Sequence, residues 1–386
     1  MNKLYSIYIL CSIFILQSCT KEDALPYADV NTFIKFKGDP LYDLTAVDAK
    51  LAPNGGVLLL ANATDANTLE VHPKLIKVDN NGVTEWEKTL EALNHISYSL
   101  QIIDESNFIV VGEDKSTATP SISVLKVDKS GGFTQYIKTT SGVPSRAKAV
   151  SVDIQNNFII VAGETTNTSN TILPVLFHLD FNLAELSFIT LSGEKSYITN
   201  QLHSVDESGV LYAYISGKNP ISLKSELIKV KLGDAVAGSP TYPQTDNSFS
   251  ISGFSPAAKP YFGLIGNNGN ILTFGFVNAE QPSSLETFTD LKSSTTANNI
   301  NSHSSGNFIV GGTYFGDASN GFEDFILMIV DKSGTVINER IYGGKSSDLL
   351  STTLTMPEGN ILLYGHSLFG DVNTLLLIKT DDEGNL

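Results

Sequence analysis

The sequence predicts an all-β protein, a seven-bladed β-propeller, and two ladders of repeated motifs carry that prediction. In the first ladder a polar turn with Asn or Gly precedes an apolar run. In the second ladder an apolar run ends in Asp, followed by a turn that closes on Gly. Both ladders advance by about 50 residues per step. Because they keep this period independently, we interpret them as two strands of one repeated unit.

The first ladder has seven copies, which predict seven blades. Their apolar runs begin at Val57, Phe108, Phe158, Val210, Ile271, Phe308 and Ile361. Two successive steps in the middle are irregular, one long and one short. They predict an insertion followed by a deletion, and a fifth blade that lacks its outer strand.

The second ladder places an acidic residue at the start of each turn. Its members are Asp79, Asp128, Asp180, Asp331 and Asp381, with Lys231 at the position of a degenerate copy. An Asp side chain accepts backbone hydrogen bonds in a tight turn, and Gly supplies the positive φ that the turn needs. Calcium would require further oxygen ligands at alternate positions, and the sequences DNNG and DKSG do not supply them.

Two further strands complete each repeat. The expected outer strands are TEWEKTL, TQYIKTT and INERIYGG, and the expected inner strands are LTAVDAKL, SYSLQIID, AKAVSVDI, ITNQLHSVD, YFGLIG and LLSTTLTM. Four short strands per period without helical periodicity are typical of a propeller blade. The last repeat ends after its turn and lacks an outer strand. The segment NTFIKFKGD near the N-terminus matches INERIYGG, so we expect it to close the last blade.

The first 30 residues predict a targeting signal followed by a tether. The apolar run 4–16 is too short to span a bilayer but suits a secretory signal. Leu16-Gln17-Ser18-Cys19 resembles a bacterial lipobox, which implies a signal peptide over 1–18 and acylation of Cys19. In the tether, 19–30, the run Lys21, Glu22 and Asp23 resembles the surface-export signal of Bacteroidota lipoproteins. The alternative for that run is a charged, solvated tether, which leaves open whether the anchor faces the exterior or the periplasm.

The repeat itself also resembles a known group. The run from Gly306 to Thr353 is similar to the blade repeat of extracellular propeller lipoproteins from Bacteroidota. That pattern is Gly-Gly, a long loop, an apolar-Lys-apolar-Asp-x-x-Gly segment, and Trp-x-Lys-x-x-Gly-Gly, of which Trp86 and Lys88 keep the last part. The resemblance covers 31–386. It implies the fold and the outer-membrane location, but no activity, because one propeller fold serves many functions.

Composition excludes several classes of protein. The chain has 25 Lys plus Arg against 41 Asp plus Glu, a formal net charge of −16. This balance disfavours binding to nucleic acid or to anionic lipid surfaces. A hydrophobic content of 41% supports a sizeable core and excludes wholesale disorder. The two cysteines, Cys11 and Cys19, leave the rest of the chain without a disulfide or thiolate metal site.

Long connections predict a binding face. We expect them to gather on one face of the ring, at 62–73, 113–121, 164–174, 216–226, 240–260 and 314–324. The longest, 240–260, brings together the candidate binding residues Tyr242, Phe249, Phe254 and Tyr261. Aromatic side chains of this kind stack on a sugar or anchor a protein. The alternative is a loop that packs over the fifth blade.

The sequence shows little catalytic chemistry. No nucleophile elbow, P-loop or dinucleotide motif is present, and the six histidines lack metal-ligand spacing. We therefore expect no catalytic residue, no metal and no cofactor, although acids from different blades could converge. The leading hypothesis is a non-catalytic protein-interaction scaffold, an accessory subunit of an outer-membrane β-barrel, transport or secretion complex. The alternatives are a surface glycan-binding lipoprotein and, third, a polysaccharide lyase or hydrolase.

Overall fold

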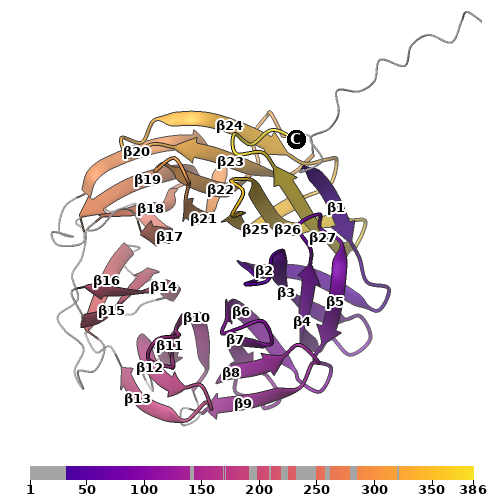
Figure 1. Cartoon of the computed structure of the whole chain (residues 1–386), viewed down its shortest axis with the longest axis vertical. Coiled ribbons are helices and arrows are strands. Elements are labelled where there is room, and N and C mark those ends of the chain that lie inside the picture. Colours follow the sequence, from indigo (N-terminus) through magenta and orange to yellow (C-terminus); the bar gives the residue numbers. More distant parts are fainter. Residues whose placement is uncertain are drawn as a thin grey trace, which may run out of the picture.

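The computed structural model describes residues 32–139, 143–167, 169, 171–190, 198–207, 210–218, 225–231, 249–256, 261–278, 285–319 and 321–386. These residues form 27 β-strands and no helix. The strands make seven sheets arranged in a ring, one sheet to a blade (Figure 1). The prediction of an all-β, seven-bladed propeller is confirmed.

Each blade is an antiparallel meander whose first strand lies nearest the ring axis. Blades one to three are β2 (Tyr42–Leu51), β3 (Val57–Asp65), β4 (Val71–Val78) and β5 (Thr84–Thr89); β6 (His95–Ile102), β7 (Asn107–Asp114), β8 (Ser121–Asp128) and β9 (Phe133–Lys138); β10 (Ser145–Asp153), β11 (Phe158–Thr166), β12 (Ile172–Asp180) and β13 (Glu185–Thr190).

The second half of the ring follows the same plan. Blades four to six are β14 (Ile198–Glu207), β15 (Val210–Lys218) and β16 (Ser225–Lys231); β17 (Phe249–Pro256), β18 (Tyr261–Asn268), β19 (Ile271–Asn278) and β20 (Leu285–Ser293); β21 (Thr295–Ser302), β22 (Phe308–Tyr314), β23 (Asp324–Val330) and β24 (Val336–Tyr342). Blade seven is β25 (Asp348–Thr355), β26 (Ile361–Phe369) and β27 (Val372–Thr380), with β1 (Phe33–Lys37) on its outer edge.

The N-terminal strand closes the ring as predicted. β1 pairs antiparallel with β27, in a register that runs from Phe33 opposite Lys379 to Lys37 opposite Leu375. The two chain ends therefore share one blade. This arrangement supplies blade seven with its fourth strand and covers the edge that β27 would otherwise expose.

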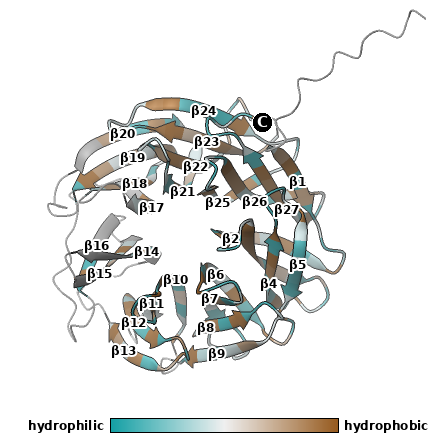
Figure 2. Cartoon of the chain, viewed as in Figure 1, coloured by the Kyte–Doolittle hydropathy of each residue, from teal (hydrophilic) through white to brown (hydrophobic). Residues whose placement is uncertain are grey.

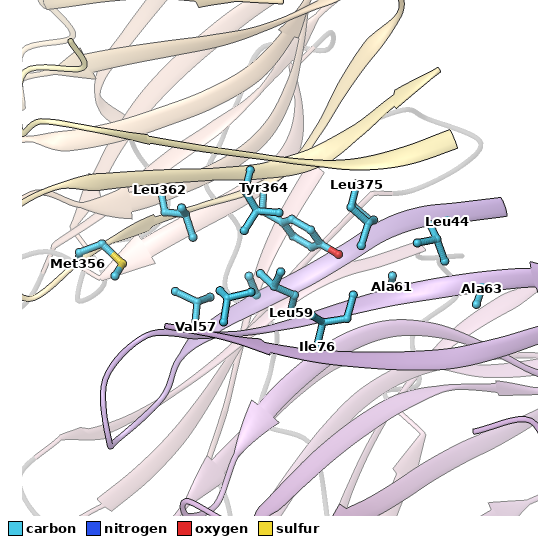
Figure 3. Close-up of a cluster of buried hydrophobic side chains, with 14 residues drawn as sticks. Leu44, Val57, Leu59, Ala61, Ala63, Ile76, Met356, Leu362, Tyr364 and Leu375 are labelled. Carbon is cyan, nitrogen blue, oxygen red and sulfur yellow. The ribbon is translucent and has the colours of Figure 1, made fainter. Parts of the chain in front are cut away.

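The core lies between neighbouring blades. The second and third strands of a blade are buried on both faces, so they read as continuous apolar runs, shown in brown in Figure 2. Figure 3 shows the cluster between blades seven and one, where Leu59 and Ile76 pack with Tyr364 and Leu375. The Tyr364 hydroxyl donates a hydrogen bond of 3.0 Å to the carbonyl oxygen of Leu60. The seam between the chain ends is thus packed and hydrogen-bonded across the blades.

The prediction for the fifth blade is wrong by one strand. GNILTFGF, expected as the second strand, forms the third strand β19, and YFGLIG, expected as the first, lies in the second strand β18. The reason is the tight connection around Gly269 between β18 and β19, which has the same turn residues that elsewhere join the first two strands. With β18 as the second strand of blade five, successive second strands begin 47 to 53 residues apart. The repeat is therefore regular, and the predicted insertion and deletion are wrong. Blade five also has its outer strand, β20.

The aspartates of the second ladder act as turn residues, as predicted. Asp79 Oδ1 accepts hydrogen bonds of 2.8 Å from the backbone amides of Asn81 and Val83. The same two bonds recur at the other four aspartates. The fourth turn residue has positive φ in every copy, and in the third copy it is Leu183, with φ 66°.

A β-bulge in every inner strand explains the glycine that ends the first motif. The seven inner strands share a register shift, as between Ala46 and Asp48 or between Leu350 and Thr352. Opposite the shift lies Ala61 in blade one and a glycine in the others: Gly112, Gly163, Gly217, Gly266, Gly312 and Gly365. A bulge bends its strand and presses backbone against the partner strand, which leaves little room for a side chain.

We expect Gly365→Ala to destabilise the protein by roughly 2–4 kcal/mol. A Cβ at this position would overlap the carbonyl oxygen of Leu349 and lie 2.5 Å from Phe325 Cζ. Gly344→Ala is the control, because nothing lies within 4 Å of its added Cβ. Urea unfolding of both variants measures the difference, and equal midpoints would contradict the close approach.

Candidate functional site

The bulges give the propeller a polar central channel. Each register shift leaves one unpaired residue, and six of these line a cavity of about 230 Å³ on the ring axis: Val47, Tyr98, Lys148, Ser252, Asn298 and Ser351. Each of these six blades therefore contributes its unpaired bulge residue to the cavity wall. These residues do not pair with the neighbouring strand, and their side chains help to set the polarity of the wall.

Most polar groups of the channel wall hold neighbouring blades together. Asp48 Oδ2 accepts a hydrogen bond of 2.9 Å from the backbone amide of Leu100. Gln201 Oε1 accepts one of 2.8 Å from the amide of Phe254. Asn299 Oδ1 of blade six accepts a hydrogen bond of 3.3 Å from the backbone amide of Thr353 in blade seven. Each of these residues comes directly after the bulge in sequence, so the bulge orients its side-chain oxygen toward the adjoining blade.

Charged groups in and beside the channel are largely compensated. Asp48 pairs with Lys50 at 2.8 Å. The Lys148 ammonium lies 3.7 Å from the centre of the Tyr98 ring, and burial lowers the pKa of Lys148. Burial, then the Glu113 carboxylate, raise the pKa of Tyr98 to about 12. Tyr98 therefore keeps its proton at neutral pH.

The connections divide between two faces of the ring. The turn face carries the links between first and second strands and between third and fourth strands. The loop face carries the links between second and third strands and between blades. The loops are shorter than predicted, because the strands extend into them: 66–70, 115–120 and 167–171 replace the expected 62–73, 113–121 and 164–174. The two-face division itself is as predicted.

The predicted aromatic loop is not a loop where the structure describes it. Phe249 and Phe254 belong to β17, and Tyr261 is the first residue of β18. Phe254 is fully buried, and its ring meets that of His203 edge to face with the ring centres 4.7 Å apart. Tyr261 stacks on Phe276 with ring centres 5.0 Å apart. The predicted loop placement is therefore wrong for Phe249, Phe254 and Tyr261, which are strand residues, and Phe254 is a core side chain.

Other predicted site residues lie outside the described part of the chain. These are Tyr242 and the N-terminal residues Cys19, Lys21, Glu22 and Asp23. Acids from different blades converge at Arg146, which pairs with Glu113 of blade two at 3.5 Å and with Glu164 of blade three at 3.4 Å. Asp324 and Asp348, from blades six and seven, both approach Gly343. Their exposed fractions are 0% and 2%, so this pair lies beneath the surface and not in the channel.

Sequence reasoning missed an apolar patch on the loop face. It consists of eight large hydrophobic side chains from blades six, seven and one: Phe36, Leu41, Leu69, Phe315, Phe322, Leu368, Phe369 and Val372. Phe322 is 77% exposed and Leu69 75%. The described loops of blades two and three carry no exposed large hydrophobic residue. Single apolar residues in short loops gave no sequence signal, because only the closed ring brings them together.

Contacts tie the loops that bear the apolar patch to one another. The rings of Phe36 and Phe369, both in blade seven, meet edge to face with centres 5.2 Å apart. Asp43 of blade one accepts a hydrogen bond of 2.5 Å from the amide of Asn373 in blade seven. The loop of blade six approaches the link between blades six and seven at Gly321, where an added Cβ would lie 2.7 Å from the carbonyl oxygen of Gly344. The loops of the three blades that bear the patch are therefore neighbours on the loop face.

The chain enters the ring on the opposite face. Phe33, the first residue of β1, packs against the turn at Gly82, where an added Cβ would lie 2.6 Å from Phe33 Cζ. That turn joins the third and fourth strands of blade one, so it belongs to the turn face. β1 then runs toward Lys37 and the loop face. The segment that precedes Thr32 is thus attached on the face away from the apolar patch.

Among the described residues, no group of three His, Cys, Asp or Glu side chains is placed to hold a metal ion. No helix there is long and apolar enough to cross a membrane.

Comparison with known proteins identifies the fold. No protein-family profile matches the chain, and no curated protein matches it. Among solved structures, the Dos1 propeller superposes with a TM-score of 0.53 at 10% identity, over 92% of this chain and 96% of that one. YCF48 bound to a D1 peptide gives 0.50 at 12% identity, over 91% and 97%. The WD40 domain of SCAP from fission yeast gives 0.48 at 9% identity, over 90% and 98%. At these identities the first two likenesses establish a β-propeller fold.

Proposed function

We propose that this chain is a non-catalytic scaffold, anchored by lipid at the cell surface, that binds a partner protein through its loop face. In this proposal it is an accessory subunit of an outer-membrane β-barrel, transport or secretion complex. The observation that carries the proposal is the apolar patch. Contiguous exposed apolar surface costs solubility and marks sites of protein interaction.

The attachment point supports this assignment. Acylated Cys19 would connect to the ring through the turn face, where β1 begins. The loop face, which carries the apolar patch, would then remain free for a partner. Removal of the predicted signal peptide, 1–18, would take away Lys3 and leave a net charge near −17. Such a charge suits a domain held in solution outside a membrane.

The glycan-binding alternative rested on the aromatic residues around 240–260. Phe254 is committed to the core, and one face of the Tyr261 ring is covered by Phe276. Phe254 therefore provides no sugar-stacking platform, and no observation in the described residues favours a glycan over a protein.

Site-specific photo-crosslinking in cells tests the proposal. A photoreactive phenylalanine at Phe322 probes the apolar patch, and the same residue at Ile154, 60% exposed on the turn face, is the matched control. We expect one discrete adduct with an outer-membrane protein from position 322 and none from 154. Equal yields from both positions, or none from 322, would refute the scaffold role.

We expect Cys19→Ser to release the protein from the membrane fraction. Acyl chains on Cys19 provide the anchor, at about 0.8 kcal/mol for each buried CH₂. Replacing Lys21, Glu22 and Asp23 by alanine should keep the protein in the membrane but protect it from protease added to intact cells. Fractionation and protease shaving distinguish these results. A Cys19→Ser protein that stays membrane-bound would contradict lipidation at this residue.

A further inference from the structure

We infer that the apolar patch receives a positively charged segment of the partner, one that combines Lys or Arg with apolar or aromatic side chains. This inference rests on the proposed function and adds the chemistry of the occupant. Its basis is the charge of the loops that bear the apolar patch.

The loops around the apolar patch are acidic. Five carboxylates surround it, from blade one (Glu70, Glu91), blade six (Asp317, Glu323) and blade seven (Asp371). One lysine, Lys345, stands among them. Four of the five acids are exposed and Glu323 is half-buried. The apolar patch therefore has an acidic rim.

The acidic rim is not neutralised within the ring. None of the five carboxylates has an ion-pair partner among the described residues. Glu91 only accepts a hydrogen bond from the Tyr42 hydroxyl, at 3.1 Å. By contrast, Asp39 in the same region is paired with Lys74 at 2.8 Å. The rim thus presents like charges that repel one another until a cation lies between them.

This combination selects its occupant. An acidic or neutral apolar segment would leave the rim uncompensated, and an apolar membrane face with anionic lipid would be repelled. A segment with Lys or Arg beside large apolar side chains satisfies both parts of the surface. Complementary charge also speeds encounter and excludes wrong partners, whereas the buried apolar side chains supply the affinity.

Selection from a random 12-residue peptide library tests the inference. The bait is the full chain with Cys19→Ser, which leaves every described residue unchanged. Enriched peptides should carry net positive charge and at least one large apolar residue. Their affinity should fall about tenfold in Phe322→Ser/Phe369→Ser, about tenfold in Glu323→Lys/Asp371→Lys, and similarly when salt is raised to 0.5 M.

The turn-face variant Ile154→Ser is the control and should leave affinity unchanged. Neutral or acidic enriched peptides, no enrichment, or equal losses in Ile154→Ser would overturn the inference. These outcomes are separable from failure of the scaffold role. A partner crosslinked through an acidic segment at position 322 refutes the charge assignment alone, whereas no adduct at 322 refutes the scaffold role.

Discussion

Deletion of residues 31–37 is expected to destabilise the fold by at least about 4 kcal/mol, because it removes the strand that closes the ring. Five residues of β1 pair with β27, and backbone hydrogen bonds contribute roughly 1 kcal/mol each in net terms. The deletion also removes Phe33, which packs on the core between blades seven and one, and the ion pair of Lys37 with Glu87 at 2.7 Å.

The loss should appear as a lower unfolding midpoint and as concentration-dependent association. Without β1, the backbone of β27 becomes an exposed edge that another chain can pair with. A chain lacking residues 24–30 is the control, since it is shortened by the same number of residues but keeps β1. If both deletions unfold at the same denaturant concentration and remain monomeric, β1 does not close the ring in solution.

The sequence predicted the architecture because the repeat is local chemistry. An Asp that accepts two amides and a residue with positive φ define a turn wherever they occur, as at Asp79 and Gly82. Closure by the N-terminal strand followed from the missing last strand and one matching segment. The turn depends on neighbours in sequence, and the closing strand is recognised because its segment matches the one that the last repeat lacks, so both are visible without coordinates.

The error at blade five has an equally local cause. Asn-Gly turns predict a hairpin but not which two strands of a blade it joins. In this blade the turn at Gly269 joins β18 and β19, the second and third strands. A strand count that takes this turn as the link between the first and second strands therefore places β18 and β19 one position too early in the blade. The bulge that would have corrected the count, between Ile251 and Gly253, follows a segment that resembles a loop in composition.

The candidate site was less predictable because it is formed by distant residues. Phe254 looked available in sequence but is fully buried. Phe322 and Leu69 lie in loops and Phe369 ends β26; they share no motif, and they come to one face only after seven blades close. A search for exposed apolar residues at equivalent loop positions of consecutive blades would have found them, once the register of the blades was known.

Acidification is expected to destabilise the protein before its carboxylates titrate, because burial lowers the pKa of two histidines, His95 and His203, to about 4. His95 begins β6, and its side chain is fully buried. Its Nδ1 lies 3.2 Å from the Ser97 hydroxyl, and its Nε2 has no hydrogen-bond partner. Burial lowers the pKa of His95 from 6.5 to about 4, against a smaller opposing effect of Asp114.

The direction of this change in the free energy of unfolding follows from proton binding. Below about pH 6.5 the unfolded chain binds a proton at His95 that the folded chain refuses until about pH 4, so the free energy of unfolding decreases across that window. The loss from this residue is about 2 kcal/mol at pH 5 and about 3 kcal/mol at pH 4. Carboxylates with lowered pKa, such as Asp331, add their losses only below about pH 4.

Urea unfolding at pH 7 and pH 5 measures the effect. His95→Gln should be less stable than the parent at pH 7, because packing is lost, but its stability should fall by about 2 kcal/mol less between the two pH values. The comparison uses slopes rather than absolute stabilities, so a general loss of packing does not imitate the result. Parallel pH profiles for the parent and His95→Gln would mean that His95 is protonated without cost in the folded ring, and therefore that the end of β6 opens to water.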